Sequence, residues 1–409
     1  MEMMKNKIKI NRYFLFIATF LLVYEVASVL VLNSWMMPHT TVVFHLVDFS
    51  MGFCSRILPG AIYNFLFDNN SVELISLYNF ILHILFLFGL AFISSVFIEK
   101  AEKENKLFWF IVLFFFFTGP TVFSMYNFER GTMDHYWAYF TLLSVFFLSS
   151  KYCYGLIVLT SLLCVMTNVG SMVTYIPFIV LLMIYKTTVI NDKKDKALLW
   201  VAIVLTVLSS AALTVYFLIN EQSNLTYTFD EFNQILNSRG YTGISPYYAS
   251  NFYYNDFFTT DGESLLAYTG NTFSDLMKEL LFRISVTFED FSIWDTIFPL
   301  LLALPLIIAI FIFFIDAFKK KTNIVKKFVF LGIITMFIVT LFAGLIFSTD
   351  TGRFIGHAFT LLFASMLYVI WSENEYEVEK IRLIVTGIPT NFIILYGICY
   401  STVLLNPVG

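Results

Sequence analysis

Residues 197–219 read ALLWVAIVLTVLSSAALTVYFLI and contain no charged side chain. A transmembrane helix needs about 20 mostly apolar residues, because the hydrocarbon core of a bilayer is about 30 Å thick and a helix rises about 1.5 Å per residue. Lys193, Lys194 and Lys196 stand just before this run, and Glu221 follows it. The stretch therefore predicts one complete membrane crossing.

The composition of the whole chain fits several such crossings. Its 409 residues are 58% hydrophobic and only 13% charged, whereas a soluble domain carries about 25% charged residues. So few charges cannot cover the surface of a water-soluble body of this length, which excludes a soluble enzyme. Gly (18) and Pro (9) are also too scarce for a fibrous or disordered chain. Four scattered cysteines without a CxxC pair indicate neither a disulfide framework nor a zinc site.

Apolar runs of membrane length recur along the sequence. We therefore predict an all-α polytopic membrane protein, one integral membrane domain over residues 1–409 with about eleven transmembrane helices. The first run is too long for the apolar region of a signal peptide, which predicts a retained span. The runs lie at 13–31, 74–98, 107–126, 136–150, 152–167, 172–190, 197–219, 297–315, 328–347, 358–372 and 383–405.

Lysine segregates to one side of these predicted spans. Of the 18 lysines, 17 fall in segments that eleven alternating crossings place on the same face, and the positive-inside rule makes that face cytoplasmic. The N-terminus is then cytoplasmic. Residues 32–73 form a first external loop, and residues 220–296 form the large external loop between spans 7 and 8. Long ordered loops are usually functional, so we expect the chemistry on the outer face. The richness in Phe, Ile, Tyr, Asn and Lys indicates an AT-rich bacterial genome.

Arginine is distributed in the opposite way. Only Arg12 and Arg382 fall on the cytoplasmic side, against the expectation of the positive-inside rule. The guanidinium group offers phosphate a planar fork of donors, whereas the lysine ammonium acts as a point charge. Selective retention of arginine predicts diphosphate binding by the five external ones: Arg56, Arg130, Arg239, Arg283 and Arg353.

Three of the external arginines stand close to acids at predicted helix ends. The stretches are DFSMGFCSR at 48–56, ERGTMDH at 129–135 and DTGRFIGH at 350–357. Ionisable groups at a membrane boundary are functional candidates, although each pair could equally be a simple ion pair between helix ends. The candidate catalytic acids or bases are Asp48, Glu129 and Asp350, and the auxiliary candidates are Asp134, His135 and His357.

The remaining polar groups carry weaker signals. The sequence has no HxxxH or HExxH spacing, so we predict no metal site and no cofactor. His83 lies inside a predicted span and indicates a hydrogen-bonded packing residue. Glu25, in the middle of the first predicted span, belongs either to a packing hydrogen bond or to a cavity.

In architecture the chain resembles the Wzy-type O-antigen or capsular repeat-unit polymerases. The resemblance rests on about 400 residues, eleven to twelve spans, a large external loop and external arginines. The stretch Asp350-Thr-Gly-Arg353-Phe is similar in style to the arginine-containing loop motifs of that family. The family pattern has two sizeable external loops, whereas the first loop here is modest. The resemblance implies glycosyl transfer at the periplasmic face of a bacterial inner membrane, for O-antigen or capsule.

The same resemblance implies a substrate and roles for the candidate residues. The growing glycan leaves undecaprenyl diphosphate and joins the next lipid-linked repeat unit, beside a chain-length regulator and within membrane lipid; no nucleic acid is involved. Arg130, Arg353 and either Arg239 or Arg283 stabilise the leaving diphosphate. Asp48, Glu129 or Asp350 deprotonates the acceptor hydroxyl.

Two other functions stay open on the sequence alone. One is a C-type glycosyltransferase that uses a polyprenyl-phosphate sugar, with Asp48 in the first external loop as its catalytic acid or base. The other is a lipid-linked oligosaccharide flippase or another transporter, which performs no chemistry. A transporter is expected to have short loops and charged groups in the middle of the membrane.

Overall fold

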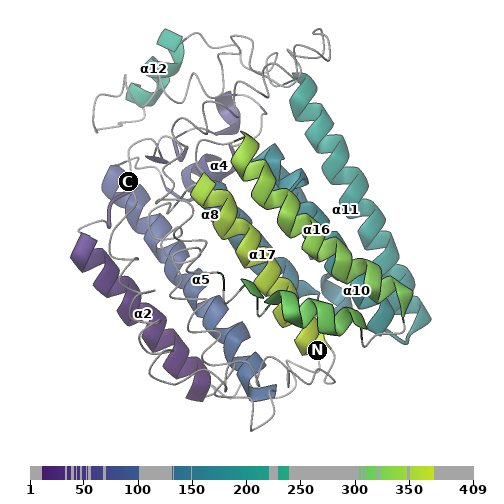
Figure 1. The fold of residues 1–409 in the computed structure, drawn as a ribbon. Helices are drawn as coiled ribbons and strands as arrows, with labels where there is room; N and C mark the ends of the chain where they lie inside the picture. The colour runs from purple at the N-terminus through teal and green to yellow at the C-terminus, as the bar shows by residue number, and fades with distance from the viewer. Residues whose placement is uncertain are drawn as a thin grey trace.

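The protein was analysed as a computed structural model. The structure describes residues 12–32, 35–37, 41–42, 44–46, 48–51, 53, 57–67, 71–100, 131, 133–148, 150–220, 229–238, 304, 307–308, 310–319, 323–347 and 351–372. These residues form helices and connecting turns, and none of them belongs to a strand (Figure 1).

The helices follow one another in the order α2 (Arg12–Leu32), α4 (Leu58–Leu66), α5 (Val72–Lys100), α8 (Met133–Phe147), α9 (Tyr154–Thr167), α10 (Tyr175–Val189), α11 (Lys193–Asn220), α12 (Phe229–Ser238), α16 (Ile324–Phe347) and α17 (Thr351–Ser372). Short 3-10 turns are η1 (Phe49–Met51), η4 (Lys151–Cys153) and η5 (Val169–Met172).

Four segments within the described part of the chain are long and apolar enough to cross a membrane. They are Val72–Phe92, Val169–Val189, Lys193–Phe217 and Ile324–Leu341. The all-helical class is therefore confirmed for the described residues, and these four segments are candidate membrane spans by length and composition. The count of eleven crossings and the cytoplasmic N-terminus stay predictions, because the predicted runs 107–126 and 383–405 lie outside the described residues and 297–315 is described only in part.

Helix boundaries follow the predicted runs closely where both exist. Helix α2 matches the run 13–31, and α11 matches 197–219 with one additional turn at its lysine-rich start. Helix α17 begins at Thr351, seven residues before the predicted run 358–372, so the stretch that contains Arg353 is already helical. Helices α4 and α12 are too short to show as membrane runs, and the sequence does not predict them.

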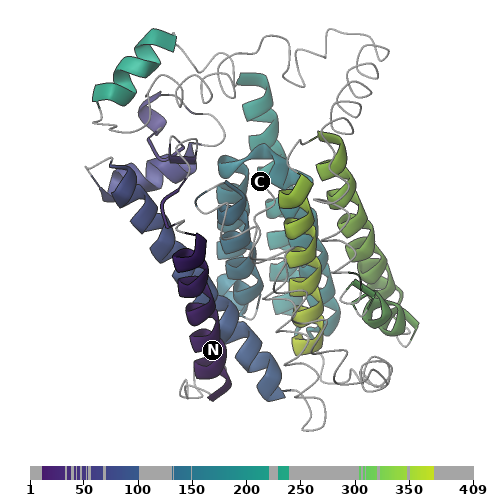
Figure 2. The same ribbon diagram turned by 60° about the vertical axis from the view of Figure 1, so that its left-hand side comes forward.

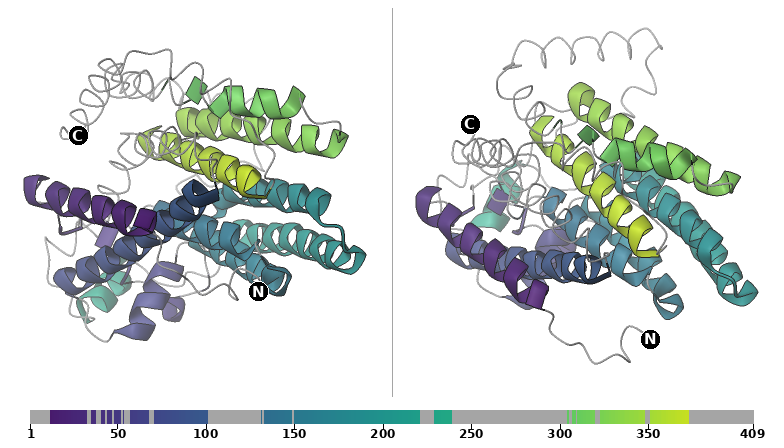
Figure 3. Two further views of the ribbon diagram at one scale, coloured as in Figure 1. Left: turned by 90° about the horizontal axis from the view of Figure 1, so that it is seen from below. Right: turned by 60° about the horizontal axis from the view of Figure 1, so that its bottom comes forward.

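Helices α2 and α5 form an antiparallel pair at one edge of the molecule. The ring of Phe14 lies 6.5 Å from that of Phe88 and 6.3 Å from that of Phe92, while Glu25 contacts His83 further along. Residue numbers therefore increase in opposite directions along the two helices. Figures 1 and 3 show this pair on the opposite side of the molecule from α11.

Helices α8, α9, α10, α11, α16 and α17 pack around the main hydrophobic core. At one end of this bundle the ring of Tyr185 lies 5.7 Å from that of Phe330 and 6.4 Å from that of Tyr368, with the Lys326 ammonium 5.7 Å from the Tyr185 ring. The end of α10, the start of α16 and the end of α17 therefore meet. We call this the lysine end, because Lys193 also begins α11 there, at the lower end in Figure 1.

The opposite end of the bundle carries a second, smaller core that includes Val42, Ile57, Tyr63 and Tyr78. Ile235 of α12 packs against it. Figures 1 and 2 show α12 beyond the helix ends on this side. The two segments predicted as external loops therefore contact each other at the end of the molecule opposite the lysine end.

Gly131, just before α8, has φ 77°, and a Cβ atom there lies 2.3 Å from Met37 Cε and 2.9 Å from Asn79 Cγ. We expect Gly131→Ala to lower the free energy of unfolding by at least about 2 kcal/mol, from the left-handed backbone and the overlap together. Thermal unfolding in detergent measures this. Gly155→Ala is the matched control, since nothing lies within 4 Å of its Cβ position. Equal melting temperatures for the two variants would contradict the prediction.

Candidate functional site

Asp48 is the candidate acid whose surroundings the structure describes. Its Oδ1 accepts hydrogen bonds from the backbone N–H (2.9 Å) and the hydroxyl (2.6 Å) of Ser50, and its Oδ2 accepts from Asn64 Nδ2 (3.3 Å). Ser50 lies in η1 and Asn64 in α4. The local turn and a neighbouring helix therefore fix both oxygens of a carboxylate that remains partly exposed.

Exposed aromatic residues follow Asp48 in the same segment of the chain. Phe49 and Phe53 are 44% and 39% exposed, and their ring centroids are 5.7 Å apart. The ring of Phe53 also lies 5.8 Å from that of Tyr216 and 5.3 Å from that of Phe217, near the end of α11. These contacts place the stretch after Asp48 at the end opposite the lysine end. We refer to Asp48, Phe49, Phe53 and Tyr216 as the Asp48 surface.

The other two sequence stretches meet through α8 and α17. Trp137 of α8 lies with its ring 5.3 Å from that of His357 in α17, and both side chains are buried. The backbone of Asp134 lies in the first turn of α8, and that of Arg353 lies in the first turn of α17. The starts of these two helices are therefore close neighbours, as a shared site requires.

His135 lies on a different face of α8 from Trp137. It is buried, and its ring is 5.6 Å from that of His83 in α5. The candidate residues that lie outside the described part of the chain stay predictions; they are Arg56, Glu129, Arg130, Arg239, Arg283 and Asp350.

A buried polar network underlies the Asp48 segment. The Nδ1 of His45 is 3.2 Å from the carbonyl oxygen of Thr41, and its Nε2 is 3.0 Å from Asn79 Nδ2 and 3.3 Å from the Tyr136 hydroxyl. In the neutral tautomer whose Nδ1–H donates to Thr41, the single lone pair of Nε2 accepts from Asn79, and the Tyr136 hydroxyl donates to Asn79 Oδ1 at 3.5 Å. Burial of the imidazole lowers the pKa of His45 to about 4.

This pKa predicts a pH-dependent stability. Unfolded chains bind a proton on His45 below about pH 6.5, whereas the folded network resists it down to about pH 4, so the stabilisation is complete above pH 6.5 and is lost as the pH falls to 4. We expect a loss of about 3 kcal/mol across that window. Unfolding in detergent at pH 7.0, 5.5 and 4.0 measures it. His45→Gln removes the titrating group, so an equal pH slope in the variant would refute the assignment.

Two further ionisable groups meet between α2 and α5. Glu25 Oε2 lies 3.4 Å from His83 Nε2, and both side chains are fully buried. This contact favours packing of Glu25 over a cavity, but it is not the hydrogen bond predicted for Glu25 and for His83, since neither nitrogen of His83 has a hydrogen-bond partner among the described residues. In the sequence, each of the two residues stands out as an ionisable group in an apolar run. Nothing in the sequence predicts that the two side chains contact each other.

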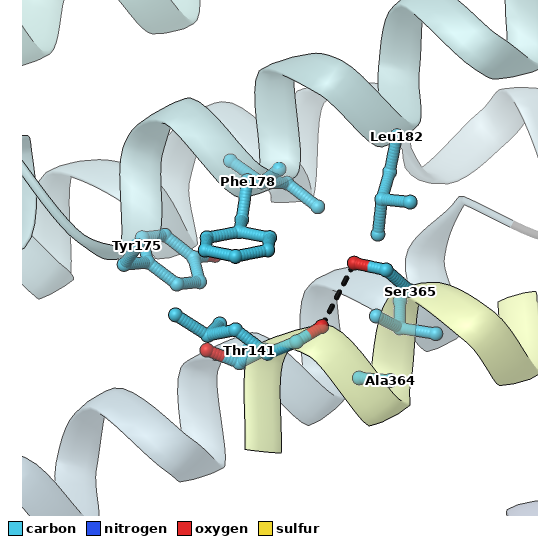
Figure 4. Close-up of a pocket in the computed structure, with 9 residues that line it drawn as sticks. Thr141, Tyr175, Phe178, Leu182, Ala364 and Ser365 are labelled. Atoms are coloured by element: carbon cyan, nitrogen blue, oxygen red, sulfur yellow. Dashed lines mark hydrogen bonds between the residues drawn. The ribbon is translucent and has the colours of Figure 1, made fainter. Parts of the chain in front are cut away.

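A small cavity lies between α8, α10 and α17 (Figure 4), with room for about one water molecule. Ser365 points toward it and donates its hydroxyl to the Leu361 carbonyl at 2.8 Å, and the rings of Tyr175 and Phe178 close the other side. The cavity is too small for a sugar or a lipid headgroup and has no part in the candidate site.

Among the residues that the structure describes, no three His, Cys, Asp or Glu side chains are grouped so that they could hold a metal ion. Comparison of the chain with protein-family models, with curated proteins and with solved structures finds no match.

Proposed function

We propose that this protein is a polysaccharide polymerase of the bacterial inner membrane, which joins undecaprenyl-diphosphate-linked repeat units by glycosyl transfer at the outer face. The observation that carries the proposal is the Asp48 surface. It has a fixed, partly exposed carboxylate in the same segment as exposed aromatic rings, at the end of the bundle opposite the lysine end.

The chemistry of glycosyl transfer fits such a surface. The acceptor hydroxyl must give up its proton, and a positioned carboxylate serves as a general base. The faces of Phe49 and Phe53 offer apolar area on which the C–H faces of a sugar ring can pack. Ser50 and Asn64 hold the carboxylate in place, so little reorganisation is needed when a sugar arrives.

The leaving diphosphate needs cations, and in this proposal they are the external arginines. Arg353 lies in the first turn of α17, beside the start of α8. In the sequence, Arg130 stands three residues before α8. Guanidinium groups at this level meet the headgroup of a lipid-linked substrate whose tail remains in the membrane. The lysine end then faces the cytoplasm, in keeping with the positive-inside rule.

The proposal predicts a difference between arginine and lysine at position 353. We expect Arg353→Lys to reduce polymer formation at least about tenfold, because lysine keeps the charge but loses the bidentate grip on phosphate. The length of the glycan ladder from cells with equal amounts of the protein measures the effect. Arg382→Lys is the control, since Arg382 lies in a predicted cytoplasmic segment. Full activity of Arg353→Lys would reduce the role of Arg353 to simple charge.

Deletion of the gene in a polymer-producing strain tests the function itself. A polymerase deletion leaves lipid A-core capped with one repeat unit, or the equivalent for a capsule. Loss of all repeat-unit display indicates a flippase or an earlier step instead, and would overturn the proposal.

A second candidate is a C-type glycosyltransferase that uses a polyprenyl-phosphate sugar. The favouring observation is that Asp48, in the first segment after α2, is the candidate acid with an ordered surface around it. That enzyme carries a monophosphate donor and depends less on the external arginines. Loss of activity with Asp48→Ala but not with substitutions at Arg239 and Arg353 would favour it over the polymerase.

A further inference from the structure

Three ionisable side chains meet deep between α2, α5 and α8. Glu25 lies seven residues from the end of α2 and His83 eleven residues into α5, about 10 Å and 16 Å along their helices. Glu25 and His83 are 3.4 Å apart, and the ring of His135 lies 5.6 Å from that of His83. All three are essentially inaccessible to solvent. The glycosyl transfer proposed above does not depend on Glu25 or His83.

The surroundings of this cluster are mostly aromatic and apolar. Phe86 lies 6.4 Å from the His83 ring, and Tyr139 lies 6.0 Å from the His135 ring. Among the described residues, the titratable neighbours are Tyr139 of α8 and Tyr24, which interacts electrostatically with Glu25 from the same helix. A net charge is costly in such a place, whereas a neutral group of polar atoms is tolerated.

Neutrality of the cluster fixes how many protons it holds. The Glu25–His83 pair is neutral when it holds one proton in addition to the N–H of a neutral imidazole. Either the carboxyl oxygen or the imidazole can carry this additional proton. The transfer from Glu25 Oε2–H to His83 Nε2 leaves a carboxylate and an imidazolium with no change in net charge. His135 adds a second imidazole next to the first, so the cluster has more basic atoms than the one proton that it needs.

Polar groups continue from this cluster toward the end of the bundle opposite the lysine end. Asn79 precedes His83 by one helical turn in α5, and Tyr136 follows His135 in α8. Both contact His45, at 3.0 Å and 3.3 Å. The α5–α8 interface therefore carries polar side chains at His83 and His135 and, nearer to residues 41–46, at Asn79 and Tyr136 beside His45.

We propose that Glu25, His83 and His135 form an intramembrane proton-binding site that exchanges protons with the outer side along the α5–α8 interface. On this route the Tyr136 hydroxyl and, beyond it, the His45 imidazole can pass a proton. The ligand is the proton itself. The site stands independently of which glycan reaction the protein performs, and it gives a membrane protein a means of responding to the proton gradient.

Nuclear magnetic resonance of the full chain, labelled with [15N]histidine and held in detergent micelles, tests the proposal. The chain has five histidines, and His83→Gln and His135→Gln identify the two signals of interest. We expect at least one of these signals to change between its protonated and neutral positions between pH 4 and pH 9. In Glu25→Gln we expect the pH response of the His83 signal to differ from that of the wild type.

Two matched variants control for indirect effects. Glu73→Gln alters an exposed acid at the start of the same helix as His83, and His357→Gln removes a buried histidine against Trp137. Neither is expected to move the His83 midpoint. If Glu25→Gln does not fold, Glu25→Asp keeps the carboxyl and must keep the titration. The wild-type titration needs no variant beyond those that assign the signals.

The proposal has clear points of failure. If the signals of His83 and His135 do not change from pH 4 to pH 9, the residues exchange no proton with solvent in this range, and the proposal is overturned. A His83 midpoint that is the same in Glu25→Gln and in wild type overturns the shared site. Tyr136→Phe removes the hydroxyl from the path, and we expect it to slow proton exchange at His83 at least tenfold. An unchanged exchange rate overturns the proposed route.

Discussion

Replacement of Asp48 by asparagine is expected to reduce glycan polymerisation at least about 100-fold, the usual loss when a positioned general base is removed. Asparagine has the shape of aspartate but cannot take the proton of an acceptor hydroxyl. Conversion of lipid-linked repeat units to polymer by membranes that contain equal amounts of each variant measures the effect. Glu73→Gln, at an exposed acid of α5, should leave the rate unchanged.

The neighbour Asn64 allows a sharper control. In the wild type, Asp48 Oδ2 accepts a hydrogen bond from Asn64 Nδ2. In Asp48→Asn an amide nitrogen takes the place of Oδ2 and faces that donor, so a loss of activity could reflect a displaced side chain. The exchanged pair Asp48→Asn with Asn64→Asp restores a donor and an acceptor at this contact. We expect the exchanged pair to stay inactive. Recovery of the rate would show that Asp48 acts by holding the loop in place and not as the base.

Leucine at either Glu25 or His83 is expected to lower the free energy of unfolding by about 3–5 kcal/mol, because the buried side chain that remains loses the ionisable group 3.4 Å away. The double variant Glu25→Leu with His83→Leu should recover most of that loss, since an apolar pair needs no compensation in an apolar site. Unfolding of the four proteins in detergent forms a double-mutant cycle.

The cycle separates two properties of the buried pair. A coupling energy of at least about 2 kcal/mol confirms that the two side chains interact directly. Simple addition of the two single losses would contradict the contact. The double variant also provides a folded protein without the proposed proton site, and His135 in it should no longer respond to a neighbouring proton.

Much of the helical layout could be predicted from the sequence, because a bilayer sets a length that an apolar run must match. The match of α2 and α11 with their predicted runs follows from that length alone. Helix α12 was missed because its ten residues mix Phe229, Phe232 and Ile235 with acids, a pattern that is amphipathic and far too short to cross a membrane.

The site was less predictable, since it depends on contacts between distant parts of the chain. Asp48 was found as a candidate from its arginine neighbour Arg56, but its partner Asn64 and the packing of Phe53 on α11 have no sequence signal. His135 was grouped with the arginine stretch, whereas its ring lies against His83. Periodicity tells which residues share a helix face but not which helix lies opposite.

The pairing of Glu25 with His83 also bears on how the protein is made. Synthesis runs from the N-terminus, and His83 follows Glu25 by 58 residues. At about 5–20 residues per second, α2 waits roughly 3–12 seconds before its partner histidine leaves the ribosome. During that time the carboxyl group has no imidazole beside it, and an ionisable group in an apolar helix opposes entry into lipid. We therefore expect α2 and α5 to enter the lipid together, and Glu25→Leu to allow α2 to leave the translocon early.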